Sequence, residues 1–261
     1  MNRTTRAHAR AILRAACLSL HVAVGMLLVL AILLPGARQL SRERLTRWWN
    51  AGLLRLLHVR VLQHGSVGPT PQLVVANHVS WLDISVLAAS IETRFVAKAE
   101  VRAWPLAGSL ATAAGTFYLQ RGAGETQALI ARLRRHLLAG GRVAVFPEGT
   151  TTPGDRLLRF QPRLFAAALG TGCTVQPVAL RYGPDANGDN IAAFVGQQSL
   201  AANLWRLLHA RELVVEVSFC PPVGDGCTNR DALARNAQCA IAAALILPVP
   251  CERIPARRLA A

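Results

Sequence analysis

The apolar residues of this chain are distributed unevenly, and the first sixty residues differ from the rest. The stretch 15–37 contains no formally charged residue and is long enough to cross a lipid bilayer, which needs about 20 apolar residues. His21 and Gly25 interrupt this stretch, so a shallow or half-inserted helix is a second interpretation. A cleavable signal peptide is disfavoured, because the apolar run is long and no small-x-small cleavage site clearly follows it.

The next segment carries an amphipathic helical pattern, with apolar residues spaced by three and four positions along one stripe. A tryptophan-bearing apolar face opposite arginines is typical of a helix at the lipid headgroup boundary, although a helix packed on a globular domain has the same pattern. We therefore predict a membrane-associating unit over residues 1–60, made of an N-terminal membrane helix and an amphipathic interfacial helix. The stripe consists of Leu45, Trp48, Trp49, Leu53, Leu56 and Leu57, and Arg44, Arg47 and Arg55 lie toward the other side.

Beyond residue 60 the chain alternates short apolar runs with segments of helical periodicity. This alternation predicts one α/β domain over residues 61–261, with a mostly buried mixed sheet flanked by helices. Strands are expected at 73–76, 95–97, 116–119, 142–146, 175–180 and 213–219, and helices at 80–90, 106–113, 125–138, 164–169, 199–209 and 231–247.

Charge and cysteine usage narrow the possible partners and location. The formal net charge is +15, and Lys98 is the only lysine in an otherwise arginine-based set. That bias is typical of a GC-rich bacterial genome, and no nucleic-acid-binding motif accompanies it, so anionic lipid headgroups and acidic substrates are the better partners. The cysteines form no Cys-x-x-Cys pair, which indicates reduced thiols facing the cytosol. We expect a bacterial inner-membrane protein whose globular domain faces the cytoplasm.

The segment 77–83 contains the clearest chemical signal. His78 stands where an expected strand ends and an expected helix begins, and Asp83 follows after four intervening residues. A helix N-terminus favours the neutral imidazole that a general base requires, and a carboxylate on the far ring nitrogen would fix its tautomer and stabilise the imidazolium as it forms. Ser80 and Asp83 also have the spacing of a helix capping box, which is the structural alternative.

Three further blocks follow in order at 115–122, 145–150 and 175–180, and they read Gly-Thr-Phe-Tyr-Leu-Gln-Arg-Gly, Val-Phe-Pro-Glu-Gly-Thr and Val-Gln-Pro-Val-Ala-Leu. Together with 77–83 they resemble the glycerolipid acyltransferase family, whose best-known members are the 1-acylglycerol-3-phosphate acyltransferases. The resemblance extends from about Leu73 to Leu180 and more loosely to the C-terminus. As an ordered set the blocks are specific, although no single block would be.

The resemblance implies an O-acyltransferase. His78 would deprotonate the hydroxyl of a lysolipid, which would then attack the carbonyl carbon of an acyl thioester, either acyl-CoA or acyl carrier protein. No covalent acyl-enzyme is implied, in agreement with a chain in which no Gly-x-Ser-x-Gly motif is found. We expect no cofactor beyond the thioester co-substrate and no metal site.

The resemblance also assigns residues to acceptor binding. Arg121 and Gly122 would contact the acceptor's phosphate, because a guanidinium can bind a phosphate through two hydrogen bonds. Glu148 and Gly149 would bind the acceptor as well, and Lys98 has a family counterpart near the phosphate. Each residue also has a structural alternative. Arg121 could be a solvated loop arginine, the Glu148 block a surface turn, and Lys98 a surface lysine.

Pro177, in the fourth block, is expected to shape the acyl-donor region, although simple strand-edge geometry explains it as well.

One segment departs from the family. The family often has a Phe-basic-x-Gly segment after the glutamate block, and here Gln161 stands at a usual basic position and Arg163 at the glycine position. This departure bears on the acceptor headgroup.

We therefore expect transfer of a fatty acyl group to a lysolipid in phospholipid biosynthesis, with 1-acylglycerol-3-phosphate as the acceptor and phosphatidic acid as the product. Arg121 and Lys98 favour a phosphate, whereas Gln161 and Arg163 argue against it. The alternatives are acylation of lyso-ornithine lipid or another lysolipid, a catalytically silent lipid-binding membrane protein on the same fold, and a hydrolase in which water replaces the lysolipid hydroxyl.

Overall fold

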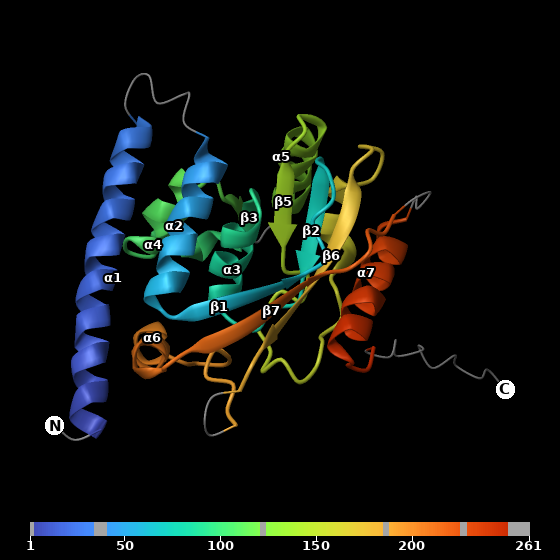
Figure 1. The fold of residues 1–261 in the computed structure, drawn as a ribbon. Helices are drawn as coiled ribbons and strands as arrows, with labels where there is room; N and C mark the ends of the chain where they lie inside the picture. Colours follow the sequence, from blue (N-terminus) through green and yellow to red (C-terminus); the bar gives the residue numbers. More distant parts are fainter. Residues whose placement is uncertain (1–2, 34–40, 121–123, 185–187, 225–228, 250–261) are drawn as a thin grey trace.

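A seven-stranded sheet forms the centre of the molecule (Figure 1). The computed structural model describes residues 3–33, 41–120, 124–184, 188–224 and 229–249. The strand order is β1-β7-β6-β2-β5-β3-β4, and all neighbours are parallel except the antiparallel pair β6 and β7. The expected mixed sheet is therefore confirmed. The strands are β1 (Val59–His64), β2 (Gln72–Ala76), β3 (Arg94–Lys98), β4 (Phe117–Leu119), β5 (Arg142–Val145), β6 (Thr174–Tyr182) and β7 (Leu213–Phe219).

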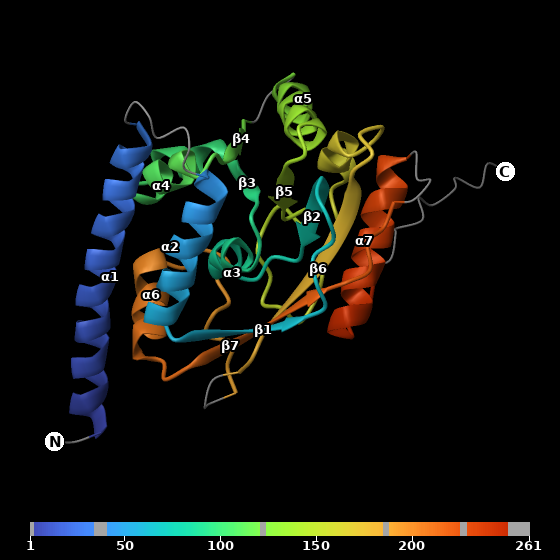
Figure 2. The same ribbon diagram turned by 45° about the horizontal axis from the view of Figure 1, so that its top comes forward.

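Helices cover both faces of this sheet (Figure 2). The helices α2, α3 and α6 contribute to the core on one face, and α5, η3 and α7 contribute to the core on the other. The α-helices are α1 (Arg3–Leu33), α2 (Arg42–Leu56), α3 (Leu82–Ser90), α4 (Ala107–Ala113), α5 (Glu125–Leu138), α6 (Leu200–His209) and α7 (Arg230–Leu245), and the 3-10 helices are η2 (Ala99–Ala103) and η3 (Pro162–Ala167).

The central strand β2 shows why its sequence is apolar throughout. Successive side chains of a strand point to opposite faces, and both faces of this sheet are covered by helices. Val74 and Ala76 belong to the core beside α2 and α3, whereas Leu73 and Val75 belong to the core beside α5 and α7. Because β2 is paired on both edges, by β5 and β6, its C-terminal end is held rigidly.

The segment 59–64 is a strand that the sequence analysis did not predict. β1 pairs in parallel with β7, with Val59 beside Leu213, at the outer edge of the sheet. Its outward side chains are largely exposed, so it lacks the continuous apolar run of the buried strands. The domain boundary expected at residue 60 consequently falls within the first strand of the sheet.

The apolar stripe of α2 faces the globular domain over much of its length. Leu53 and Leu57 are buried in the same core as α3, so the alternative of an amphipathic helix packed on the domain is correct for them. Trp48 is 57% exposed, so the domain does not cover this part of the stripe. Ser41 caps the helix, since its hydroxyl accepts a hydrogen bond from the Arg44 N–H.

Helix α1 lies along the outside of α2, α4 and α6 (Figures 1 and 2). The buried guanidinium of Arg14 donates hydrogen bonds to the carbonyl oxygens of Leu208 and Ala210 at the end of α6. The His21 ring stacks on Trp49 of α2 at 4.8 Å, and the Trp49 indole N–H donates to the His21 carbonyl oxygen. By length and composition alone, residues 7–32 could cross a membrane.

Candidate active site

The turn between β2 and α3 carries the first motif and is tied to the sheet by Asn77. The Asn77 carboxamide accepts a hydrogen bond from the Leu180 N–H at 2.8 Å and donates one to the Leu180 carbonyl oxygen at 2.9 Å. This exchange imitates a backbone pair between the end of β2 and β6. It positions the following residue, His78, at the C-terminal end of the central strand, an edge at which parallel α/β sheets bind their ligands.

His78 and Asp83 are in direct contact. The His78 Nδ1 lies 2.7 Å from Asp83 Oδ2, and the Asp83 side chain is completely buried while that of His78 is 19% exposed. A carboxylate accepts hydrogen bonds, so Nδ1 carries the proton and Nε2 is left with its lone pair. The imidazole is therefore oriented as a base whose free nitrogen is accessible.

The capping alternative for Asp83 also holds, and the two interpretations are compatible. Asp83 Oδ2 accepts hydrogen bonds from the Val79 N–H at 2.7 Å and the Ser80 N–H at 2.9 Å, in addition to the one from His78. These two amides precede α3 and would otherwise be buried without partners. One carboxylate therefore holds the turn in shape and orients the imidazole.

The side of the His78 ring is covered by Phe146, which follows β5. The two ring centroids are 4.2 Å apart and the ring planes are 16° from parallel. Stacking at this distance restricts rotation of the imidazole, so the direction of its free Nε2 is determined by Asp83 and Phe146 together.

Glu148 lies behind the same turn. Its Oε1 accepts a hydrogen bond from the His78 N–H at 2.7 Å, and its Oε2 accepts one from the Leu158 N–H at 2.8 Å. Burial raises the pKa of Glu148, and the hydrogen bonds from Leu158 and His78 oppose that rise. Each carboxylate oxygen has a second lone pair, so the contact with an acceptor remains a prediction beside this structural role. Gly149 follows with a φ of +73°, a conformation that favours glycine.

The other residues singled out from the sequence lie farther along the sheet. Lys98 is exposed at the end of β3, in register with Leu119 of β4. Arg121 and Gly122 follow that strand and lie outside the described residues. Pro177 is buried within β6 beside Val75 of β2.

A polar hollow of about 230 Å³ borders the ends of β3 and β4. Arg102, Gln120 and Arg132 line it together with Glu125. Gln161 and Arg163, the residues that depart from the family pattern, are both exposed at the start of η3. The end of β4, which closely precedes Arg121 in the sequence, therefore has a mainly basic environment.

An apolar groove of about 300 Å³ begins beside the turn that carries His78 and Asp83. Trp81 and Ile84, which flank Asp83 in sequence, form part of its wall, and the rest comes mainly from α1, α2, α3 and α4. No local sequence pattern indicates this groove, because its walls come from segments distant in sequence. Among its lining residues are Leu28, Ile32, Leu45, Trp49, Ala88, Phe95, Trp104, Ala107 and Leu110.

Tyr182 is a further residue of this site that no sequence motif indicated. This tyrosine ends β6, and its hydroxyl donates a hydrogen bond to Asp83 Oδ1 at 2.7 Å. Residues so far apart in the sequence meet only because β6 pairs with β2. No local motif could have revealed this contact.

Both the sequence and the fold are similar to those of known proteins. Residues 58–181 match the acyltransferase family. The chain is 44% identical to the lyso-ornithine lipid O-acyltransferase of Pseudomonas aeruginosa, over 92% of this chain and 95% of that protein. It is 35% identical to the 1-acyl-sn-glycerol-3-phosphate acyltransferase of Neisseria meningitidis, over 74% of this chain and 77% of that protein. Its fold matches the crystal structure of PlsC, the 1-acyl-sn-glycerophosphate acyltransferase of Thermotoga maritima, with a TM-score of 0.70 over 94% of this chain and 97% of that one, at 19% identity.

Proposed function

The chain belongs to the acyltransferase family and acylates a lysolipid hydroxyl, and we propose that its acceptor is lyso-ornithine lipid. The observation that carries the catalytic part is the His78–Asp83 pair, with Nδ1 hydrogen-bonded and Nε2 free. The acceptor is argued from the 44% identity that extends over nearly the whole length of a lyso-ornithine lipid O-acyltransferase. This revises the sequence-based expectation of 1-acylglycerol-3-phosphate. The polar hollow near β4 could bind the carboxylate of an ornithine headgroup or a phosphate equally well. It therefore does not discriminate between the two acceptors.

The proton movements follow from the orientation of His78. Nε2 takes the proton of the acceptor hydroxyl as its oxygen attacks the thioester carbonyl carbon, and Asp83 stabilises the imidazolium that forms. A carbon–oxygen bond forms, the carbon–sulfur bond of the tetrahedral intermediate then breaks, and the imidazolium returns its proton to the departing thiolate. Neither step requires a nucleophilic side chain. The donor is a thioester of coenzyme A or of acyl carrier protein.

The apolar groove is suited to an acyl chain. It begins at Trp81 and Ile84, next to the catalytic pair, and its lining is almost entirely apolar. Burial of an acyl chain there would stabilise the complex by about 0.8 kcal/mol for each methylene group removed from water. The reacting carbonyl would then lie at the groove's catalytic end, near His78.

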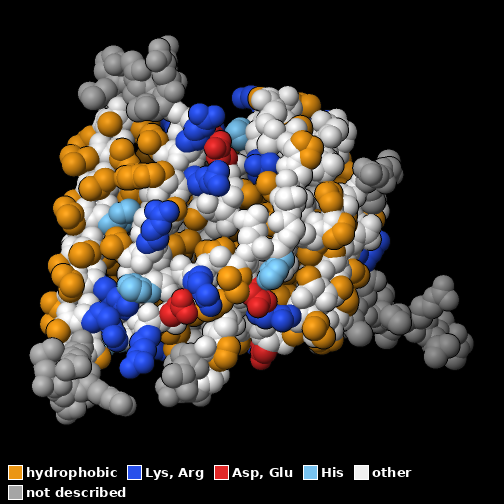
Figure 3. All heavy atoms as spheres, viewed as in Figure 1, with side chains coloured by type: hydrophobic (Ala, Val, Ile, Leu, Met, Phe, Trp, Pro, Cys, Tyr) orange, Lys and Arg blue, Asp and Glu red, His pale blue; other side chains and the backbone are white. Residues whose placement is uncertain are grey.

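Membrane attachment is assigned to the outer face of α1. Figure 3 shows hydrophobic side chains along this edge of the molecule, and Leu13, Leu20 and Leu27 are each about two-thirds exposed. A contiguous apolar face of this kind marks a membrane or interaction surface. Because α1 also packs against α2, α4 and α6, the same helix connects the membrane to the groove. We place the protein at the bacterial inner membrane with its catalytic domain toward the cytoplasm.

Replacing Leu13, Leu20 and Leu27 together by aspartate should lower binding to lipid vesicles at least about tenfold. Each leucine otherwise transfers an apolar side chain from water into the lipid, which contributes about 1.5–3 kcal/mol. Vesicle sedimentation measures the bound fraction. Leu138→Asp is the matched control, because Leu138 is 61% exposed at the end of α5, on the other side of the sheet. Equal sedimentation of the triple variant and the wild type would place the attachment elsewhere.

A donor-by-acceptor panel tests the acceptor. Purified protein is incubated with lyso-ornithine lipid or 1-acylglycerol-3-phosphate, each with acyl-CoA or acyl carrier protein thioester, and products are identified by lipid mass spectrometry. Ornithine lipid should form at least about tenfold faster than phosphatidic acid, a difference of about 1.4 kcal/mol in transition-state binding. Formation of phosphatidic acid alone, with rescue of a strain lacking its own lysophosphatidate acyltransferase, would return the assignment to 1-acylglycerol-3-phosphate. A His78→Ala preparation serves as the blank.

A further inference from the structure

The hydrogen bond from Tyr182 occupies a distinct place at the Asp83 carboxylate. Oδ2 of Asp83 accepts from His78, Val79 and Ser80, whereas Oδ1 accepts from the Tyr182 hydroxyl at 2.7 Å. The Asp83 side chain is completely buried. Since the carboxylate is out of contact with bulk water, its charge is balanced by these donors rather than by solvent.

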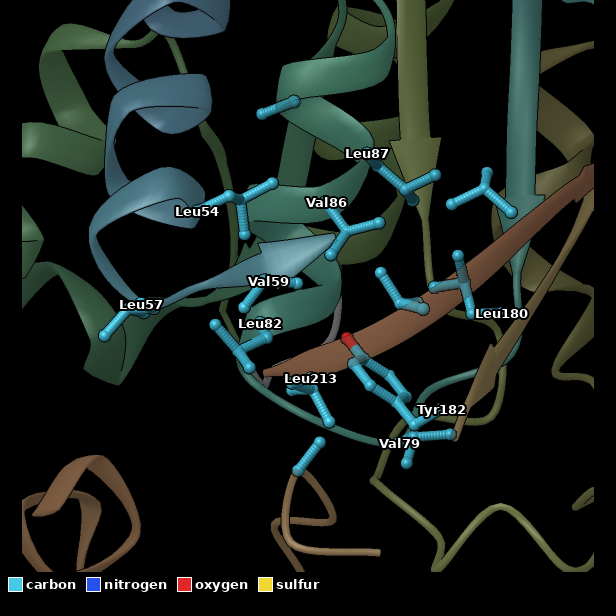
Figure 4. Packing of buried hydrophobic residues seen from close by; sticks show 14 of the residues in the cluster. Leu54, Leu57, Val59, Val79, Leu82, Val86, Leu87, Leu180, Tyr182 and Leu213 are labelled. Carbon is cyan, nitrogen blue, oxygen red and sulfur yellow. The ribbon is translucent and has the colours of Figure 1, made fainter. Parts of the chain in front are cut away.

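Tyr182 is held in place by an apolar environment. Its side chain lies among Val79, Leu82 and Leu180, with its oxygen directed away from the strand that carries it (Figure 4). Tyr182 as a whole is 8% exposed, and a phenol buried to this degree needs a hydrogen-bond partner. Burial and the adjacent Asp83 charge raise the pKa of Tyr182 well above its ordinary value. The hydroxyl therefore stays protonated and donates throughout the working pH range.

We propose that Tyr182 is a positioning residue that, by drawing charge from Asp83, sets the pH range over which His78 works as a base. The inference rests on the proposed role of His78. Asp83 attracts the His78 imidazolium, and that attraction weakens as more of the carboxylate charge is taken up by other donors. The hydrogen bond from Tyr182 therefore weakens the attraction that Asp83 exerts on the imidazolium. It also fixes the plane of the carboxylate, so that Oδ2 points at Nδ1.

The titratable groups around the His78 imidazole come from three parts of the fold. Asp83 lies on α3, Tyr182 ends β6, and Glu148 follows β5 with its carboxylate bonded to the His78 N–H. Phe146, stacked on the imidazole, carries no charge. The Glu148 carboxylate is bonded to the backbone N–H groups of His78 and Leu158, whereas the Tyr182 hydroxyl is bonded to Asp83. A change in the pH profile of a Tyr182 variant can therefore be assigned to the lost hydroxyl.

The direction of the effect follows from the charges. Without the phenol, more of the Asp83 charge acts on the imidazolium, so the acidic limb of the activity profile should lie at higher pH. Tyr182→Phe should move the acidic midpoint of the kcat/KM profile upward by roughly half a pH unit to one unit. An unchanged midpoint with a lower melting temperature or a lower plateau rate would show a purely structural role and overturn the proposal.

A second measurement remains informative if Tyr182→Phe folds poorly. The chain has two tyrosines, so a Tyr118→Phe background leaves Tyr182 as the single site for incorporation of 3-fluorotyrosine. The fluorinated phenol is a stronger donor, and the acidic midpoint should move to lower pH than in the same background with ordinary tyrosine. A shift in the opposite direction, or none, would refute the inference. Both profiles use whichever lysolipid is acylated, so a wrong acceptor assignment and a wrong Tyr182 assignment give different results.

Discussion

His78→Ala is expected to lower kcat by about 10²–10⁴-fold or more, because the variant has no base to take the proton of the attacking hydroxyl. Folding should be little affected, since the side chain is partly exposed and its Nδ1 contact is one of four at Asp83. Product formation is followed by lipid mass spectrometry with both substrates saturating, and vesicle sedimentation checks that membrane binding is retained.

His64→Ala is the control for this experiment, because His64 is an exposed histidine at the end of β1, outside the catalytic turn. It should leave kcat unchanged. A general base contributes at least about a hundredfold to the rate. If His78→Ala kept more than about a third of wild-type turnover, His78 would therefore not be the general base.

Asp83→Asn is expected to lower kcat by about 10²–10⁴-fold, and its cost in stability should be limited to about 1–3 kcal/mol for the Tyr182 hydroxyl, which loses its acceptor. The amide oxygen can accept from His78, Val79 and Ser80 as the carboxylate does, and the amide NH₂ can donate to the oxygen of Tyr182. The turn therefore keeps its shape, but the negative charge that stabilises the imidazolium is gone. Steady-state kinetics and thermal unfolding measured on the same preparation separate the two effects.

Asp83→Ala provides the comparison. It removes the acceptors of four hydrogen bonds at once and leaves buried donors, each of which costs about 1–3 kcal/mol when unsatisfied. We expect this variant to lose activity and to unfold at a clearly lower temperature. If the asparagine variant kept near-normal kcat, Asp83 would have a capping role alone.

Local patterns predicted the helices and strands with strong periodicity. The helix at 125–138 and the strand at 213–219 have the observed bounds, because each has a regular apolar pattern and clear turn signals at its ends. The edge strand β1 was missed, since its exposed side chains weaken the apolar signal. For α2, periodicity identified the helix but not the side on which its apolar face would be covered.

The contact between His78 and Asp83 could be predicted because both residues lie in one short segment. Tyr182 could not, because its contact with Asp83 depends on the pairing of β6 with β2. The position of Glu148 illustrates an intermediate case. Its block was recognised, but the hydrogen bonds that its carboxylate accepts from the backbone of His78 and Leu158 depend on the path of two loops.

The pairing of β1 with β7 also determines the order of events during synthesis. About 150 residues separate the two strands, so at 5–20 residues per second roughly 7–30 s pass before β1 meets its partner. The helix α6, whose end binds Arg14 of α1, emerges in the same late interval. For most of translation α1 can therefore pack only against α2 and then α4 of its own chain, and the contact of Arg14 with the end of α6 is made late. The sheet is therefore completed only near the end of synthesis.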